Sequence, residues 1–213
     1  MKVISFSLYG SHPMYYEGML RNAELAAKIY PDWGVWCYVG PEVNGDWRNK
    51  LASRGVKVVD ASTAFAGTCL AKRNKFTGTF WRFLAARDKG VKIMISRDAD
   101  SRLNVREKAA VDAWLSSGKK YHVMRDHQNH KRWLMLAGMW GVVGHFDMLS
   151  LLMDFKLCGR RGEDQEFLRS RVWPLARKNC IEHGYGGLPM PPHPAYTGFV
   201  GQRFTENDVG LQD

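Results

Sequence analysis

Two features that often reveal what a protein does are missing from this sequence: a long hydrophobic run and closely spaced cysteines. No apolar stretch approaches the roughly 20 residues that a helix needs to cross a bilayer. The N-terminal stretch, MKVISFSLYGSHP, turns polar too early to be a signal peptide. We therefore expect a protein that is made and used in the cytoplasm.

The cysteines are few and lie far apart. They are Cys37, Cys69, Cys158 and Cys180, and no two of them form a C-x-x-C motif. This spacing argues against a zinc ribbon and against a redox motif. We expect reduced thiols that are mostly buried.

Acidic residues are outnumbered by basic ones. The 213 residues include 21 Asp and Glu against 31 Lys and Arg, which gives a formal net charge of +10. The densest basic groups are Lys72-Arg73-Asn74-Lys75, Lys131-Arg132 and Arg160-Arg161. This balance is compatible with an anionic ligand or partner, such as phosphates, an acidic glycan, nucleic acid or a membrane surface. It also favours solubility, so it identifies no partner by itself.

Strand-like and helix-like stretches alternate along the first hundred residues. Apolar and β-branched residues predict strands at 2–8, 33–39, 56–59 and 91–95. Helical spacing of apolar residues predicts helices at 17–29, 46–53 and 80–86, with a basic loop at about 64–78. Pro31 ends the first of these helices. The alternation predicts a parallel sheet with helical crossovers.

The second half of the chain continues this pattern less regularly. We expect strands at 121–124 and 137–143 and helices at 106–116, 146–156 and 164–172. The last forty residues are rich in Gly and Pro and predict a long irregular segment laid over the sheet. The sequence has no repeat and no clear linker, so we expect a single α/β domain, 1–213, with a mostly parallel central sheet flanked by helices.

Two carboxylates follow a predicted apolar strand in the stretch IMISRDADSRL, which covers 93–103. Asp98 and Asp100 stand just past the carboxyl end of that strand, where open α/β sheets bind ligands. A divalent cation such as Mg²⁺ or Mn²⁺ would offset their repulsion and prefers carboxylate oxygens. Arg97 and Arg102 either assist with phosphate charge or neutralise the pair. The alternative is a solvated turn with two local ion pairs.

The order of motifs along the chain resembles that of the GT-A nucleotide-sugar glycosyltransferases, and most closely the glycogenin and lipopolysaccharide galactosyltransferase type. The motifs are FWRFL at 80–84, DAD at 98–100, LAGMWG at 136–141, GEDQEFL at 162–168 and a Gly-rich end that carries His183 and His193. The whole-chain pattern also resembles a little-characterised set of bacterial and viral glycosyltransferase-like proteins. The resemblance covers nearly the whole chain.

The resemblance implies a GT-A-like (Rossmann-like) domain in which residues 1–100 bind a nucleoside-diphosphate sugar and residues 101–213 form the acceptor side. It implies a Mn²⁺ or Mg²⁺ ion on Asp98 and Asp100. It implies donor contacts from Ser7, Leu8, Tyr9, Gly10, Arg82, Asp98, Ala99 and Asp100. The C-terminal His-x-Gly-x-x-Lys-Pro-Trp motif of the glycogenin type is absent. His183 and His193 therefore stand only as candidates for a further metal ligand.

A sugar transfer also needs a carboxylate near the reacting atoms, as a base or as a nucleophile. The candidates are Asp164 and Asp126, and the candidate acceptor contacts are His127, Gly138, Trp140 and Gln165. Structural roles stay open beside these. Asp164 is also placed to cap a helix, and Asp126 with His127 can form a buried polar pair. Tyr9 and Trp140 can be ordinary core aromatics.

The function predicted from the sequence is metal-dependent transfer of a hexosyl or pentosyl unit from a nucleoside-diphosphate sugar to a hydroxyl acceptor. The basic charge allows an acidic polymer as acceptor, such as hydroxymethylated viral DNA in a host cytoplasm, or a surface glycan or glycoprotein. Two alternatives remain. A magnesium-dependent nuclease or phosphohydrolase usually needs more carboxylates than this pair recruits. A non-catalytic nucleic-acid-binding module would leave the DAD motif unexplained.

Overall fold

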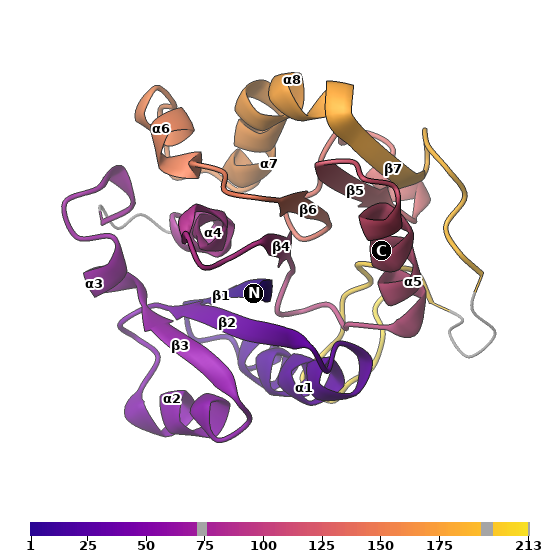
Figure 1. Cartoon of the computed structure of the whole chain (residues 1–213). Coiled ribbons are helices and arrows are strands. Elements are labelled where there is room, and N and C mark those ends of the chain that lie inside the picture. Colours follow the sequence, from indigo (N-terminus) through magenta and orange to yellow (C-terminus); the bar gives the residue numbers. More distant parts are fainter. Residues whose placement is uncertain (72–75, 193–197, 213) are drawn as a thin grey trace.

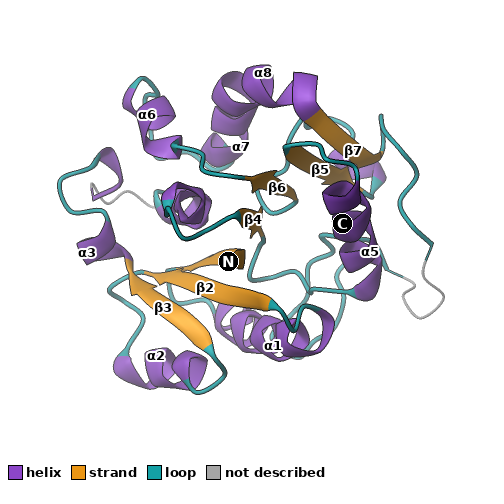
Figure 2. Cartoon of the chain, viewed as in Figure 1, coloured by secondary structure: helices purple, strands orange, loops and turns teal. Residues whose placement is uncertain are grey.

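The computed structural model describes residues 1–71, 76–192 and 198–212, which form an α/β domain around one sheet (Figures 1 and 2). The strand order in the described part is β3-β2-β1-β4-β6-β5-β7. The strands are β1 Lys2–Leu8, β2 Trp33–Val39, β3 Val56–Asp60, β4 Ile93–Ser96, β5 Tyr121–Arg125, β6 Trp140–Val143 and β7 Cys180–Gly184. The described part has no helix long and apolar enough to cross a membrane.

All strands except β6 run in one direction. β1 pairs in parallel with β2 and with β4, and β2 pairs in parallel with β3. β6 is antiparallel to both of its neighbours, β4 and β5, and β5 pairs in parallel with β7. The carboxyl ends of β1, β4, β5 and β7 therefore lie along the same edge of the sheet.

The helices are short apart from α1 and α5, and several begin at a side-chain cap. They are α1 Pro13–Ile29, α2 Gly45–Ala52, α3 Ala61–Ala64, α4 Gly78–Trp81, α5 Val105–Ser116, α6 Met148–Met153, α7 Glu163–Phe167 and α8 Trp173–Ala176. Asn44 accepts a hydrogen bond from the backbone of Trp47, and Asn104 accepts one from the backbone of Glu107. These bonds satisfy amide groups that lack a partner inside the helix.

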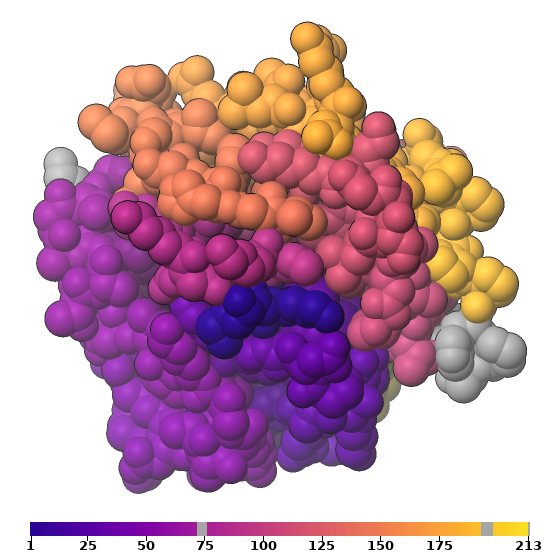
Figure 3. All heavy atoms as spheres, viewed as in Figure 1, coloured from indigo at the N-terminus to yellow at the C-terminus, as the bar shows by residue number. Residues whose placement is uncertain are grey.

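Helices cover both faces of the sheet (Figure 1), and the buried apolar side chains form one core on each face. One core joins β1 and β2 to α1, α2 and α5, and contains Met19, Leu51 and Trp114. The other joins the sheet to α4, α6, α7 and α8, and contains Phe83 and Phe167. In Figure 3 the yellow C-terminal segment lies against the pink part of the chain that includes α5. Arg106 of α5 contributes to this contact, because it donates hydrogen bonds to the carbonyls of Pro191 and Gly198.

The sequence-based prediction of an α/β domain with a mostly parallel, helix-flanked sheet is confirmed. The prediction that the last forty residues are irregular is wrong in one place, because β7 lies among them and pairs with β5. The five residues of β7, CIEHG, are too few to show a clear alternation of apolar and polar side chains. The division of the chain into a donor half and an acceptor half stays a prediction.

Two predicted helices differ from the expected α-helix. The predicted helix 80–86 begins at Gly78 and continues as a 3-10 segment over Arg82–Arg87. The predicted helix 164–172, which the sequence extends to Pro174 or a little beyond, contains a π segment, Leu168–Val172, and does continue through Pro174 to the end of α8. The basic group Lys72-Arg73-Asn74-Lys75 lies outside the described residues.

Candidate functional site

Asp98 and Asp100 leave the sheet directly after β4 with different exposure. Asp98 is half-exposed, whereas Asp100 is buried. Burial, followed by the charge of Asp98, raises the pKa of Asp100 to about 6. The alternative of a solvated turn is therefore wrong for Asp100. A buried carboxylate beside another carboxylate is an arrangement that a bound cation would stabilise.

Arg82 brings a third carboxylate to this pair. Its buried guanidinium lies 2.7 Å from Oδ1 of Asp98 through Nη1, and Nη2 donates to Oδ2 of Asp164 at 3.2 Å. Its backbone amide donates to Oγ of Ser7 at 3.0 Å, which fixes the 3-10 segment to the end of β1. Burial raises the pKa of Asp164, and the charge of Arg82 opposes that shift. The Arg82 guanidinium thus contacts two carboxylates, Asp98 and Asp164, and the charge of Asp100 also raises its pKa.

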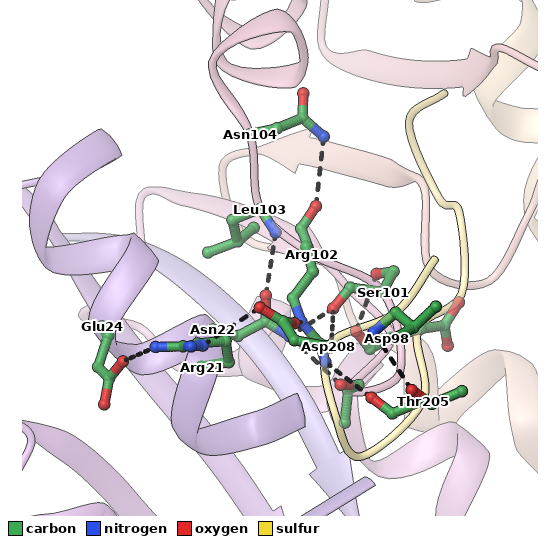
Figure 4. Close-up of polar contacts among 12 residues, drawn as sticks. Arg21, Asn22, Glu24, Asp98, Ser101, Arg102, Leu103, Asn104, Thr205 and Asp208 are labelled. Atoms are coloured by element: carbon green, nitrogen blue, oxygen red, sulfur yellow. Dashed lines mark hydrogen bonds and ion pairs between the residues drawn. The ribbon is translucent and has the colours of Figure 1, made fainter. Parts of the chain in front are cut away.

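The two arginines of the RDADSR stretch do not face these carboxylates. Arg97 is buried and donates to Glu107 at 2.7 Å. Arg102 donates a hydrogen bond to Asp208 at 2.6 Å, a contact that is drawn in Figure 4. The expectation that Arg97 and Arg102 neutralise the pair or meet a phosphate is therefore wrong, and Arg82 supplies the neighbouring positive charge instead.

A cavity of about 310 Å³ is lined in part by Arg102, and neither Asp98 nor Asp100 lines it. Its lining residues are Glu17, Leu20, Arg21, Glu24, Arg54, Arg102, Glu206, Asn207 and Asp208. Several charges in this cavity are paired within the chain, as in the Arg21–Glu24 and Arg102–Asp208 contacts drawn in Figure 4.

The residues predicted to hold the donor at the end of β1 divide into two groups. Leu8 is fully buried in the core, so its side chain is not available to a ligand. Tyr9 lies edge-on to Trp81 and close enough to Arg82 and Asp164 for their charges to act on its pKa, which burial raises. Gly10 has a φ of +74°, and its amide donates to Glu42 at 2.6 Å. Tyr9 and Gly10 therefore remain at the edge of the site.

Ala99 anchors the loop between the two carboxylates to α1. Its carbonyl accepts a hydrogen bond from Nδ2 of Asn22 at 3.3 Å. The same carbonyl packs against Gly18, where an added Cβ would lie 2.1 Å from the oxygen. The loop that presents Asp98 and Asp100 is therefore held by backbone contacts that only glycine at position 18 permits.

Gly138 and Gln165 also lie at the carboxylates. A Cβ on Gly138 would stand 1.9 Å from Oδ2 of Asp98. The backbone amide of Gln165 donates a hydrogen bond to Oδ1 of Asp164 at 3.0 Å. The side-chain oxygen of Gln165, Oε1, is buried and has no hydrogen-bond partner in the described part of the chain. Trp140, in contrast, is fully buried with its ring against Phe83. The structure therefore assigns Trp140 to the core and not to a sugar platform.

Asp126 and His127 hold the C-terminal segment. Oδ1 of Asp126 lies 2.9 Å from a guanidinium nitrogen of Arg106, and Oδ2 accepts a hydrogen bond from the backbone of Val200 at 2.8 Å. The ring of His127 stacks on Phe199 at 4.2 Å. The buried polar role left open for Asp126 and His127 matches these contacts. Asp164 is the candidate carboxylate that the structure brings to Asp98.

The structure does not bring His183 to the carboxylate pair. Its Nδ1 lies 2.8 Å from Nε2 of His122 in the neighbouring strand, and burial lowers the pKa of both imidazoles. The described residues contain no cluster of three or more His, Cys, Asp or Glu placed to hold a metal ion. His193 lies outside the described residues. A cation would therefore be held by Asp98 and Asp100 together with ligands that the substrate or water supplies.

Two residues that the sequence analysis missed lie beside the pair. Tyr15, on the first turn of α1, keeps only 36% of its surface exposed, and partial burial followed by the charges of Asp100 and Asp98 raises its pKa. Arg203 of the C-terminal segment acts on the same tyrosine and on Asp100, and Ser101 and Arg203 form a β-bridge. Neither residue belongs to a motif, and the chain places Arg203 more than a hundred positions from Asp100.

We expect the substitution Gly138→Ala to weaken binding of Mn²⁺ with a nucleoside diphosphate by tenfold or more, because the new methyl group would displace the Asp98 carboxylate. Isothermal titration calorimetry measures the affinity, and circular dichroism checks the fold. Gly45→Ala is the matched control, because nothing lies within 4 Å of a Cβ added there. Unchanged affinity in Gly138→Ala would show that the position of Asp98 does not matter for the ligand.

No protein-family model and no curated protein sequence matches the chain. The fold, however, is found in solved structures. Glucosyl-3-phosphoglycerate synthase from Mycobacterium tuberculosis, in complex with Mn²⁺, UDP and phosphoglyceric acid, is 13% identical over 91% of this chain and 72% of its own, with a TM-score of 0.54. The complex of the same enzyme with Mn²⁺, UDP and glucosyl-3-phosphoglycerate is 14% identical over 91% and 73%, with a TM-score of 0.53. At these identities the likeness shows that the chain shares the fold of this enzyme, which agrees with the GT-A-like fold predicted from the sequence.

Proposed function

We propose that this protein is a metal-dependent glycosyltransferase that moves a sugar from a nucleoside-diphosphate sugar to a hydroxyl acceptor. The observation that carries the proposal is a pair of carboxylates after β4 that lie in different environments. Asp100 is buried and its pKa is raised, whereas Asp98 is half-exposed and contacts Arg82. The similar structures include one bound to Mn²⁺ and UDP-glucose, which supports a divalent cation and a nucleotide-sugar donor for this chain.

Mn²⁺ or Mg²⁺ on Asp98 and Asp100 would supply electrostatic stabilisation of the leaving diphosphate. The chain itself provides the positions of the surrounding groups. Gly18 and Asn22 fix the loop that presents the two carboxylates. Tyr9 and Gly10 at the end of β1 are placed to meet the nucleoside. We assign no role in donor binding to the side chain of Leu8.

Asp164 is proposed as the carboxylate that acts at the reaction centre. Arg82 orients Asp164 through Nη2 and holds Asp98 through Nη1. One guanidinium therefore sets the separation between the proposed catalytic carboxylate, Asp164, and the proposed donor-side carboxylate, Asp98. The raised pKa of Asp164 makes its carboxylate a better proton acceptor for an incoming hydroxyl than an exposed aspartate would be. Gln165 and Gly138 are proposed to face the acceptor.

The acceptor is proposed to be anionic. The chain carries a net charge of +10, and Arg161 and Arg203 lie close enough to Tyr15 to act on its pKa. The similar M. tuberculosis enzyme is described with phosphoglyceric acid, which is itself anionic. A small phosphorylated or carboxylated hydroxy compound and an acidic polymer both fit this charge. The cytoplasm stays the predicted location.

We expect Mn²⁺ together with UDP, GDP, ADP or another nucleoside diphosphate to raise the melting temperature more than either component alone. With Mn²⁺ and the matching nucleotide sugar, slow donor hydrolysis should release free sugar without any acceptor. Asp98→Asn should lose both effects, whereas Asp112→Asn on the exposed side of α5 should keep them. Metal-dependent cleavage of a phosphodiester without a sugar donor would instead indicate a nuclease or phosphohydrolase. Nucleic-acid binding that needs no cation and survives Asp98→Asn would indicate a binding module.

A further inference from the structure

An exposed apolar patch lies beyond the carboxyl ends of β5 and β7. Its large side chains are Leu134, Tyr185 and Leu188, which are 42, 40 and 53% exposed. They belong to two loops that Arg125 ties together, since its guanidinium donates to the carbonyl of Leu134 at 2.5 Å and to that of Tyr185 at 2.7 Å. The backbone of Leu188 folds back onto the end of β7, because its carbonyl accepts a hydrogen bond from the amide of Gly184 and its own amide donates to the carbonyl of Glu182.

The rim of the patch is cationic. The ammonium of Lys131 lies 4.4 Å above the ring of Tyr185, and the guanidinium of Arg132 lies 5.4 Å from the ring of Trp133. Residues 127–135 and 184–190 contain no acidic residue. Aromatic rings, leucines and flanking Lys or Arg in one exposed surface are typical of proteins that sit at a membrane interface.

We propose that this patch docks the protein on a bilayer that contains anionic phospholipids. The exposed leucines find an apolar environment at the boundary between headgroups and acyl chains, and they would find none on a hydrated glycan or a nucleic acid. The cationic rim matches the negative potential of such a surface. This inference goes beyond the proposed sugar transfer and does not depend on it.

Docking through the patch would also orient the candidate site. β5 and β7 run in the same direction as β4, because β6 is antiparallel to both β4 and β5. The patch therefore lies along the same edge of the sheet as Asp98 and Asp100. A protein bound through it would turn this edge, with the candidate site, toward the headgroups.

Flotation with phospholipid vesicles tests the proposal. We expect binding to vesicles of phosphatidylcholine with 30 mol% phosphatidylglycerol that falls with added salt, and about tenfold weaker binding to phosphatidylcholine alone. Leu134→Ser/Leu188→Ser and Lys131→Glu/Arg132→Glu should each reduce the binding about tenfold.

The chain offers a matched control for each pair. Met153→Ser/Leu175→Ser removes two exposed apolar side chains elsewhere, and Lys89→Glu/Lys92→Glu makes the same charge change before β4, at the opposite edge of the sheet. Both controls should bind vesicles within about twofold of the wild type.

Three results would overturn the proposal. The first is no binding to anionic vesicles, or binding that Leu134→Ser/Leu188→Ser leaves intact. The second is a change of oligomeric state in that variant by light scattering, which would make the patch an interface between copies. The third is binding to heparin or DNA that only the charge variant loses. Stabilisation of each variant by Mn²⁺ and nucleotide, measured in parallel, separates failure of docking from failure of the proposed function.

Discussion

Replacing Asp100 by asparagine is expected to stabilise the metal-free protein at neutral pH and to abolish its use of a nucleotide-sugar donor. Burial and the charge of Asp98 raise the pKa of Asp100 to about 6. At pH 7.5 the folded protein must therefore keep a buried carboxylate ionised, which a neutral amide of similar size avoids. A shift of about two units corresponds to at most about 3 kcal/mol in the free energy of unfolding.

The gain in stability should depend on pH in a defined direction. Below about pH 3 the carboxyl group is mostly neutral in both the folded and the unfolded protein, so its burial costs little there. As the pH rises through about 6, the folded wild type loses stability relative to the Asp100→Asn variant. Chemical denaturation of both proteins in EDTA, at several pH values between these limits and at pH 7.5, measures the difference.

Activity should change in the opposite direction. An amide oxygen carries no charge and is a poorer ligand for Mn²⁺ or Mg²⁺ than a carboxylate, so Mn²⁺-dependent donor hydrolysis should fall by about 100-fold or more. A substitution that raises stability and lowers activity is expected where a side chain serves binding at a cost to the stability of the fold. Asp112→Asn should change neither quantity, because Asp112 is exposed. If Asp100→Asn keeps both hydrolysis and stabilisation by Mn²⁺, Asp100 does not hold the cation.

The parts of the site that could be predicted from the sequence are those set by position along a strand or a helix. Asp98 and Asp100 follow an apolar strand, and parallel strands bring their carboxyl ends to one edge. Arg82 directly follows the buried aromatic pair Phe80-Trp81 of α4, and Asp164 lies in the first turn of α7. Local patterns indicated all four of these residues, and the structure brings them together.

The partners of charged residues could not be predicted in the same way. Arg97 and Arg102 each stand beside a site carboxylate, yet their partners are Glu107 and Asp208, the latter 106 positions away. Asp126 is a candidate catalytic carboxylate in the sequence, but its Oδ2 accepts a hydrogen bond from the backbone of Val200, 74 positions away. A sequence shows which charges exist, and the path of the chain decides which of them meet.

Arg97 is expected to matter for stability and not for the donor. Its guanidinium donates to Glu107 at 2.7 Å, to the carbonyl of Ser96 at 2.7 Å and to that of Trp140 at 3.3 Å. The hydroxyl of Tyr30 donates to the same Glu107 carboxylate at 3.0 Å, and all of these side chains are buried. Arg97→Met should therefore lower the free energy of unfolding by about 3 to 5 kcal/mol, because it leaves the carboxylate of Glu107 buried without its cation.

A second substitution distinguishes a lost ion pair from lost packing. Arg97→Met/Glu107→Leu removes both charges and should recover most of the stability, since well-packed apolar side chains often replace a buried pair without loss. Arg169→Met, which removes the exposed partner of Glu166, should change the free energy of unfolding by no more than about 0.5 kcal/mol. Urea denaturation at pH 7.5 measures all three variants. The folded double variant should still be stabilised by Mn²⁺ and nucleotide. If it folds normally but loses that stabilisation, Arg97 contacts the donor after all, and the buried network with Glu107 is not its main role.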